Sequence, residues 1–225
     1  MGFLIYFAII ILVPIWASMK VKTTYNKYSQ VPSSSQMTGY EVARRILDSH
    51  GLYDVDVEEG HGFLSDHYDP RTKTVRLSPA NFHGHSLAAA AVAAHEVGHA
   101  IQDQENYAFL RLRHSLVPVA NIGSNFSWIL ILVGILANIS GAVLLGIIFM
   151  AAAVLFQVVT LPVEFNASSR AMNEIVSLGI IRNEEERHTR KVLSAAALTY
   201  VAAAAVAVLE LLRLILIYTG MNNED

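Results

Sequence analysis

Three apolar stretches of the 225-residue chain are long enough to supply four membrane spans in total. The first, residues 1–19, has no charged side chain, and as a helix it would reach about 28 Å, roughly the thickness of the hydrocarbon core. It differs from a cleaved signal peptide because its first basic residue, Lys20, follows the apolar run instead of preceding it. We therefore predict an uncleaved anchor helix at residues 1–19.

The second apolar block, residues 120–161, contains no ionisable side chain and is too long for one span. As a single helix it would be about 60 Å long, roughly twice the bilayer core. Residues 138–141, with the sequence Asn-Ile-Ser-Gly, lie near its middle and have the composition of a tight turn. We predict a transmembrane hairpin with spans at about 119–137 and 142–161.

The last apolar block, residues 195–219, is rich in alanine and contains two ionisable residues, Glu210 and Arg213. They lie three positions apart, so they share a helix face and can pair inside the bilayer. We interpret the pair as a link between spans, with a transport role as the less favoured alternative. The small side chains would also permit association with a second copy of the chain or with a membrane partner protein, although they are equally normal within one bundle.

Basic residues are divided unequally among the segments that connect these spans. The segments 20–118 and 162–194 contain every Lys and Arg except Arg213, which lies within the last span. By the positive-inside rule both segments are cytoplasmic, and both chain termini are outside. The predicted fold is therefore a mainly α-helical, multi-pass membrane protein with four transmembrane helices and a small cytoplasmic domain at 38–118, joined by the helical region 162–194.

The polar segments predict a small α+β domain. Residues 20–37 are polar and Ser-rich, so we expect a linker there. Thr38 and Glu41 have the spacing of a capping box that opens a helix ending near Gly51. The sequence Asp-Pro-Arg-Thr at 69–72 is typical of a turn and predicts a β-hairpin between 65–68 and 74–77.

A further helix is predicted from about Ser86 to Gln104, with Ser86 as its cap. Its alanine-rich stretch is too short to cross a bilayer and suits close packing instead. The chain has no cysteine, so it has no disulfides, no thiolate metal site and no thiol nucleophile. A net charge of −3 gives no reason to expect nucleic acid as a partner. Any metal must therefore be held by His, Asp or Glu.

His95 and His99 lie four residues apart on this helix, so both imidazoles lie on one face, one turn apart. Two nitrogens placed in this way can bind one Zn²⁺ at about 2.0–2.1 Å each. Glu96 can then lie beside a metal-activated water without binding the metal, and act as general base. Gly98, between the two ligands, permits close approach of another segment. The alternative is a helix whose histidines only cap or pack.

A catalytic zinc usually has three protein ligands, and Glu164 is our candidate for the third. No histidine downstream of His99 completes a longer motif. Pro162 suits the first turn of a new helix that would present Glu164 near the cytoplasmic membrane surface. The predicted hairpin returns the chain to the face of His95. The alternative is a helix-terminal acid favoured by the macrodipole. If Glu164 is not a ligand, the next candidates lie in the hairpin: Asp66, His67 and Asp69.

Three segments occur in this order along the chain: DHYDPR at 66–71, AHEVGHAIQ at 94–102 and LPVEF at 161–165. Together they resemble the bacterial family of membrane-bound neutral zinc metallopeptidases of the YugP type. The resemblance covers nearly the whole chain. It implies a zincin-like fold in a bacterial cell membrane, Zn²⁺ as cofactor, His95 and His99 as ligands, and Glu96 as catalytic base.

The stretch from Glu164 to Ala167 also resembles the third-ligand helix of the wider glutamate-zincin group. That group often has Asp four residues after the ligand Glu, where this chain has Ser168, so Ser168 or Asn166 would have to orient the zinc-bound histidine. In such enzymes a strand beside the motif helix often binds the substrate backbone, and Thr74–Leu77 is our candidate, with an ordinary exposed strand as the alternative. For oxyanion stabilisation the sequence leaves Arg170, His188 and the local tyrosines open.

The expected function is that of a membrane-embedded zinc endopeptidase that hydrolyses peptide bonds of membrane or membrane-proximal proteins. One alternative is a site-2-type intramembrane protease, but that class takes its third ligand from an Asp in a span, and the predicted spans contain no Asp. The other alternative is a catalytically silent membrane adaptor with a residual zinc site. The intact Glu96 argues against an adaptor, because a structural zinc does not need that carboxylate.

Overall fold

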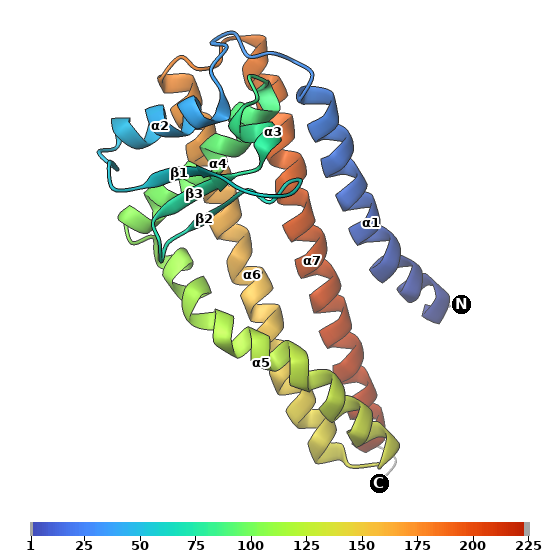
Figure 1. Cartoon of the computed structure of the whole chain (residues 1–225). Helices are drawn as coiled ribbons and strands as arrows, with labels where there is room; N and C mark the ends of the chain where they lie inside the picture. Colours follow the sequence, from blue (N-terminus) through green and yellow to red (C-terminus); the bar gives the residue numbers. More distant parts are fainter. Residues whose placement is uncertain (1, 223–225) are drawn as a thin grey trace. The chain divides into compact units, whose positions relative to one another are not determined.

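The computed structural model describes residues 2–222, and these are mostly helical (Figure 1). The helices are α1 (Gly2–Tyr28), α2 (Gly39–Ser49), α3 (Pro79–Phe82), α4 (Leu87–Gln104), α5 (Ala108–Leu136), α6 (Ser140–Ser177) and α7 (Glu184–Asn222). The strands are β1 (Asp56–Glu59), β2 (His67–Asp69) and β3 (Thr74–Leu77). The prediction of a mainly helical chain with a small strand-containing part is therefore confirmed.

Four helices among the described residues, α1, α5, α6 and α7, are long and apolar enough to cross a membrane. Large apolar side chains such as Trp16, Phe126 and Leu216 are exposed along them, as expected for surfaces that face lipid. α5 and α6 are joined by three residues, of which Asn138 has a left-handed φ of 55°. The four spans and the turn of the hairpin agree with the sequence prediction.

Two helices are longer than their sequence suggests. α1 continues to Tyr28, so the connecting segment that we expected at 20–37 begins only after that residue. α6 runs through Pro162, where we expected a new helix to start. Proline removes one backbone hydrogen bond but its φ fits a helix, and long apolar helices often tolerate it. Pro14 and Pro118 lie inside α1 and α5 in the same way.

The chain divides into two compact units. One comprises residues 2–14, 108–162 and 200–222, and the other comprises 15–107 and 163–199. In the first unit, Arg213 forms an ion pair with Glu210, as their spacing predicts, and donates from Nε to the hydroxyl of Tyr6 at 3.1 Å. The pair therefore links α7 to α1 within this unit.

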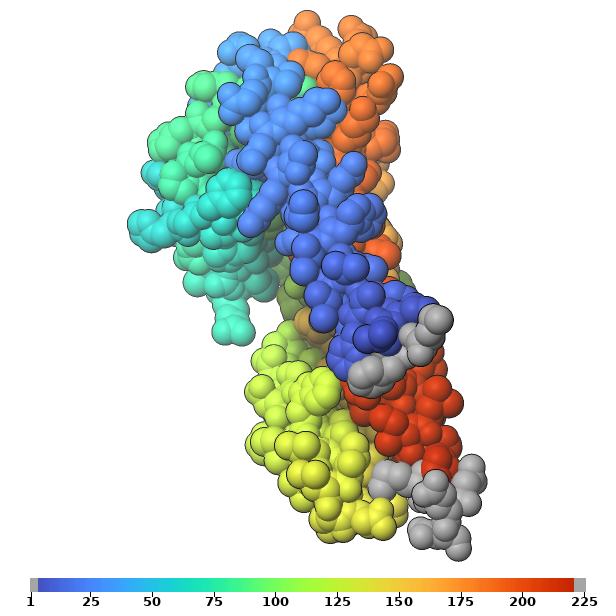
Figure 2. Space-filling view, turned by 90° about the vertical axis from the view of Figure 1, so that its right-hand side faces the viewer, coloured from blue at the N-terminus to red at the C-terminus, as the bar shows by residue number. Residues whose placement is uncertain are grey.

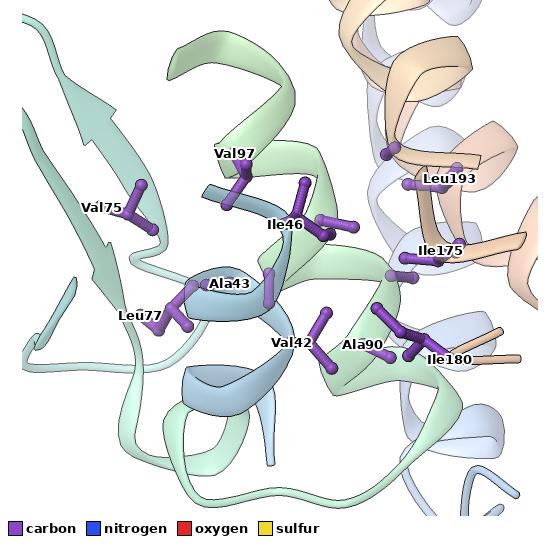
Figure 3. Packing of buried hydrophobic residues seen from close by; sticks show 14 of the residues in the cluster. Val42, Ala43, Ile46, Val75, Leu77, Ala90, Val97, Ile175, Ile180 and Leu193 are labelled. Atoms are coloured by element: carbon purple, nitrogen blue, oxygen red, sulfur yellow. The ribbon is translucent and has the colours of Figure 1, made fainter. Parts of the chain in front are cut away.

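The second unit has its core where α2 and β3 pack on α4, with α6 and α7 on the other side (Figure 3). Ile46, Leu77, Val97 and Ile175 are almost completely buried there. The capping box at Thr38 is formed as predicted, because its hydroxyl accepts from the backbone of Glu41 at 3.1 Å. α4 is thereby held on several sides by apolar contacts.

The three strands form a sheet in the order β1-β3-β2. β2 and β3 pair antiparallel and form the predicted hairpin, while β1 pairs parallel to β3. The prediction that Thr74–Leu77 is a substrate-binding edge strand is therefore wrong, because β3 is the central strand and has partners on both sides. Local sequence does not predict the strand order, because that order depends on the parallel pairing of β3 with β1 on the side opposite to β2. Of the two edge strands, β2 is linked to α4 by the hydroxyl of Tyr68, which donates to Asp103 at 3.1 Å.

Candidate metal centre

α4 positions two histidines on one face. It begins at the predicted cap, where the Ser86 hydroxyl accepts from the backbone of Ala89 at 3.1 Å. The rings of His95 and His99 lie edge to face, with centroids 4.8 Å apart and an interplanar angle of 84°. This is the arrangement that a spacing of four residues predicts for a helix.

Gly98 lies between these histidines, at a close approach of α4 to α6. A Cβ atom placed on Gly98 would lie only 2.7 Å from the carbonyl oxygen of Ala167. The expectation that Gly98 permits close approach of another segment is confirmed. The neighbouring segment belongs to α6, whose preceding turn contains Glu164.

Glu164 meets both histidines. Its Oε2 atom lies 3.2 Å from Nε2 of His95 and 3.7 Å from Nε2 of His99, and its side chain is 2% exposed. The three ligand atoms lie within 4.8 Å of one another, and they form the metal-ligand group found among the described residues. In a tetrahedral site with bonds of about 2.0–2.1 Å, ligand atoms are about 3.3–3.4 Å apart. These donors therefore suit a zinc ion in both type and spacing.

His95 is held from its other ring nitrogen. The hydroxyl of Ser168 lies 3.2 Å from Nδ1 of His95. Ser168 stands four residues after Glu164, at the position where we expected an orienting group. A hydroxyl can accept the Nδ1 proton, which leaves Nε2 with its lone pair directed at the candidate metal position.

His99 is held by an amide whose orientation is fixed. The Nε2 atom of Gln102 donates to the carbonyl of Val163 at 2.8 Å and to Oδ1 of Asn166 at 2.9 Å. Both donors of the amide are thereby used, so its oxygen faces Nδ1 of His99 at 3.0 Å. An oxygen at that place requires a proton on Nδ1, and the lone pair of His99 is therefore on Nε2, the atom near Glu164.

The same network continues along α6. Arg170 donates from Nε to Oδ1 of Asn166 at 2.7 Å and pairs through Nη2 with Glu105 at 2.6 Å. We expected Asn166 or Ser168 to orient a histidine. In the structure Ser168 contacts His95 directly, and Asn166 contacts Gln102, which in turn contacts His99. Gln102 was not singled out from the sequence, although it follows His99 by three residues on the same helix face.

Glu96 differs from its polar neighbours because its carboxylate makes no hydrogen bond or ion pair with any residue from 2 to 222. The residue is 8% exposed. Burial raises the pKa of the Glu96 carboxyl, and the charges of His95 and His99 act in the opposite direction. A buried carboxylate with an elevated pKa and free lone pairs is suited to accept a proton near neutral pH.

The alternative ligand candidates are engaged elsewhere. Asp66 accepts from the backbone of Ser78 at 2.7 Å, and Asp69 accepts from the backbone of Arg71 at 2.9 Å. His67 is exposed, with Nδ1 2.8 Å from a backbone carbonyl. These three residues are not part of the group formed by the histidines of α4 and Glu164.

Two of the candidates for oxyanion stabilisation, Arg170 and His188, also interact with other residues. Arg170 is occupied by Asn166 and Glu105, and the ring of His188 packs against that of Tyr28 at 5.2 Å between centroids. Burial and the nearby Asp103 raise the pKa of Tyr68, so its phenol stays protonated and able to donate. Among the described tyrosines it is the one on an edge strand that lies against α4.

Comparison with known proteins agrees with this geometry. The family model described as "Putative neutral zinc metallopeptidase" matches residues 3–219. The chain belongs to this family. It is also 55% identical, over 210 residues and 93% of each chain, to a protein of Bacillus subtilis (strain 168) named "Putative membrane protease YugP". The resemblance inferred from the three motifs is thereby confirmed.

Membership of the metallopeptidase family indicates zinc as the metal and a membrane as the setting, in accord with the four apolar helices. No solved structure matches the chain, so the zincin-like character of the fold stays a prediction.

Proposed function

We propose that this protein is a membrane-embedded zinc endopeptidase that hydrolyses peptide bonds of membrane or membrane-proximal proteins. The observation that supports it most directly is the convergence of His95, His99 and Glu164 beside Glu96, a buried carboxylate without a partner among residues 2–222. A structural zinc site does not need an additional, unpaired carboxylate such as that of Glu96 beside its three ligands.

Each residue has a distinct task in the proposed reaction. His95 and His99 bind zinc through Nε2, and Glu164 binds it through a carboxylate oxygen. Zinc bound there would polarise the scissile carbonyl and acidify the attacking water. Glu96 accepts the proton that the water loses, and transfers it to the amide nitrogen as the C–N bond breaks. Ser168 and Gln102 keep both imidazoles in the tautomer that can bind metal.

For the substrate backbone, β2 replaces β3 as our candidate strand. It forms one side of the sheet, and among the described residues its ladder hydrogen bonds are to β3 alone. Its Tyr68 is linked to Asp103 on α4, the helix that contains the metal-binding motif. A peptide added to the free side of β2 would make backbone hydrogen bonds that depend little on side-chain identity.

The proposal favours a membrane-associated substrate because the third ligand stands on a helix that is itself a candidate span. Glu164 lies on α6, three residues past the apolar segment predicted at 142–161. A site-2-type intramembrane protease fits less well, since the acid of this cluster is a Glu and the apolar part of α6 has no Asp.

The test is to measure bound zinc and proteolysis separately in the purified full chain. Glu96→Gln should retain about one zinc per chain and lose hydrolysis of an unfolded protein substrate, because Glu96 moves protons and does not bind the metal. Glu164→Ala should lose both zinc and hydrolysis. Glu174→Ala, on the same helix, is the matched control and should change neither, because its partner His50 is not part of the cluster.

Two results would contradict the proposal. Full hydrolysis by Glu96→Gln would refute the general-base assignment. Stoichiometric zinc with no hydrolysis of any tested protein by the unmodified chain would favour the adaptor. A further check is the separation between metal and Glu164 in an experimental structure with zinc, where about 2.0–2.2 Å is expected.

A further inference from the structure

The second unit contains a basic cavity that the proposed peptidase chemistry does not use. It has a volume of about 530 Å³ and lies between the C-terminal half of α1 and the start of α7. Figure 2 shows these two segments beside each other, α1 in blue and the beginning of α7 in orange. The lining residues are Lys20, Thr23, Thr24, Lys27, Tyr28, Lys191, Ser194, Ala195 and Leu198.

The lining comes from two helix faces, each of which contains at least one lysine and a hydroxyl side chain. On α1, positions 20, 23, 24 and 27 have the spacing of one helical face, and it contains two lysines and two threonines. On α7, positions 191, 194, 195 and 198 also form one face, with a lysine and a serine followed by apolar residues. Two faces that both contain ammonium groups are therefore opposed across the cavity.

No carboxylate balances these charges. The cavity lining contains no Asp or Glu, and within residues 2–222 none of Lys20, Lys27 and Lys191 forms an ion pair. Opposed like charges destabilise a helix contact unless an anion lies between them. The Ser194 hydroxyl in the lining is a donor that suits a phosphate oxygen, whereas the Thr23 hydroxyl donates to the carbonyl of Met19 at 2.8 Å.

The location of the cavity on the two helices selects the kind of anion. Lys20 follows immediately after the apolar run 1–19 of α1, and Lys191 precedes the alanine-rich block 195–219 of α7, so both lysines stand near the ends of apolar runs within these helices. Basic pockets between membrane helices on the cytoplasmic side are typical binding sites for acidic lipid head groups. Leu198, on the apolar end of the lining, suits an acyl chain.

We propose that this cavity binds the phosphate group of an anionic phospholipid, held by Lys20, Lys27 and Lys191. The site is separate from the proposed peptidase site, because its lining includes neither the metal-ligand group nor Glu96. It gives the chain a specific lipid ligand in addition to the bilayer that surrounds its spans.

The test uses the purified full chain in micelles of an uncharged detergent with a fluorescent phosphatidylglycerol. Binding is measured by titration, and unlabelled phosphatidylglycerol, phosphatidylcholine or inorganic phosphate is added as competitor. The variant Lys20→Gln/Lys27→Gln/Lys191→Gln should bind about tenfold or more weakly, because three favourable charges are lost. Unlabelled phosphatidylglycerol should displace the probe, while phosphatidylcholine and millimolar phosphate should not.

The matched control, Lys22→Gln/Arg182→Gln/Arg187→Gln, removes the same charge from exposed positions of this unit outside the cavity. It should bind within about twofold of the unmodified chain. Equal loss in both variants would show a diffuse surface effect and overturn the site. Displacement by phosphate alone would show that the cavity takes a free anion, and would overturn the lipid assignment. Far-UV circular dichroism and gel filtration establish that each variant is folded.

Discussion

Individual hydrogen bonds decide which nitrogen of each histidine can bind metal. His95 and His99 are both held at Nδ1, one by the Ser168 hydroxyl and the other by the Gln102 amide oxygen. The amide cannot rotate without losing two hydrogen bonds from its nitrogen, to Val163 and Asn166. With Nδ1 of each ring held in this way, Nε2 is the nitrogen that faces Glu164 and the proposed metal position.

This arrangement predicts a specific role for Gln102 as a positioning residue. Gln102→Met keeps the side-chain length but removes the acceptor at Nδ1, so zinc affinity should fall by about 10–100-fold, the usual effect of losing an orienting partner. Gln102→Glu keeps an acceptor there and should bind zinc more tightly than Gln102→Met. Zinc dissociation constants, measured by competition with a chromophoric chelator, report this effect without reference to activity.

The control is Gln104→Met on the same helix, where the side chain is exposed. It should leave zinc affinity unchanged. If Gln102→Met bound zinc as tightly as the unmodified chain, the amide would have no part in preparing His99. Equal affinity of the Met and Glu variants at Gln102 would show that only packing matters at this position.

Among individual residues, the sequence was most informative for those that belong to one motif. The spacing of His95 and His99 predicted a shared helix face, and the expected place of Glu164 beside them agrees with the group that the structure brings together; their roles stay a proposal. The links from Gln102 to Asn166 and from Arg170 to Glu105 cross between α4 and α6. Such contacts depend on how two helices pack, which no local pattern contains.

The contact between α4 and α6 is the element-scale feature on which the cluster depends. At Gly98 the two backbones touch, so any side chain there must push the helices apart. Gly98→Ala should therefore move Glu164 away from the histidines, weaken zinc binding, and cost about 1–3 kcal/mol of stability, as overpacking usually does. Zinc titration and thermal unfolding of the purified chain measure both effects.

Gly141→Ala is the control for the loss of glycine itself. It also lies in a helix, but a Cβ atom there would have no neighbour within 4 Å among the described atoms. This variant should be neutral or slightly stabilising, because alanine favours a helix over glycine by up to about 1 kcal/mol. Unchanged zinc affinity in Gly98→Ala would show that the helices can separate without disturbing the site.

Element boundaries were predictable where a side chain defines them. Thr38 and Ser86 cap α2 and α4, and Asn138 adopts the left-handed conformation in the hairpin turn. Pro162 gave the wrong boundary, because the α6 backbone accepts a proline without ending. The order of the strands, and with it the central place of β3, depends on long-range pairing and could not be derived from composition.

At the scale of the whole molecule, the charge distribution predicts how the chain is oriented in the membrane. The distribution of Lys and Arg predicts that 20–118 and 162–194 face the cytoplasm. The prediction also places the C-terminal tail outside, but residues 223–225 lie outside the described part of the chain. The hairpin turn, which is predicted to lie on the same side, is therefore the better position for a label. The chain has no cysteine, so single cysteines can be introduced without background.

Cysteines at Ser34 and Ser177 should be protected from a membrane-impermeant thiol reagent in intact cells, whereas one at Ala137 should react. All three positions are exposed in the structure. After permeabilisation all three should react, which controls for accessibility. Reaction at Ser34 together with protection at Ser177 would place these positions on opposite sides and contradict the four-span arrangement. Reaction at both and protection at Ala137 would invert the orientation.

The alanine-rich first half of α4 has a consequence for how such a chain can change over evolutionary time. Leu87 to Ala94 are almost all buried, and most of their side chains are a single methyl group. A methyl group has no rotamers with which to yield, so a larger residue at these positions has to move a neighbouring backbone. Drift on this helix is therefore confined to the smallest residues.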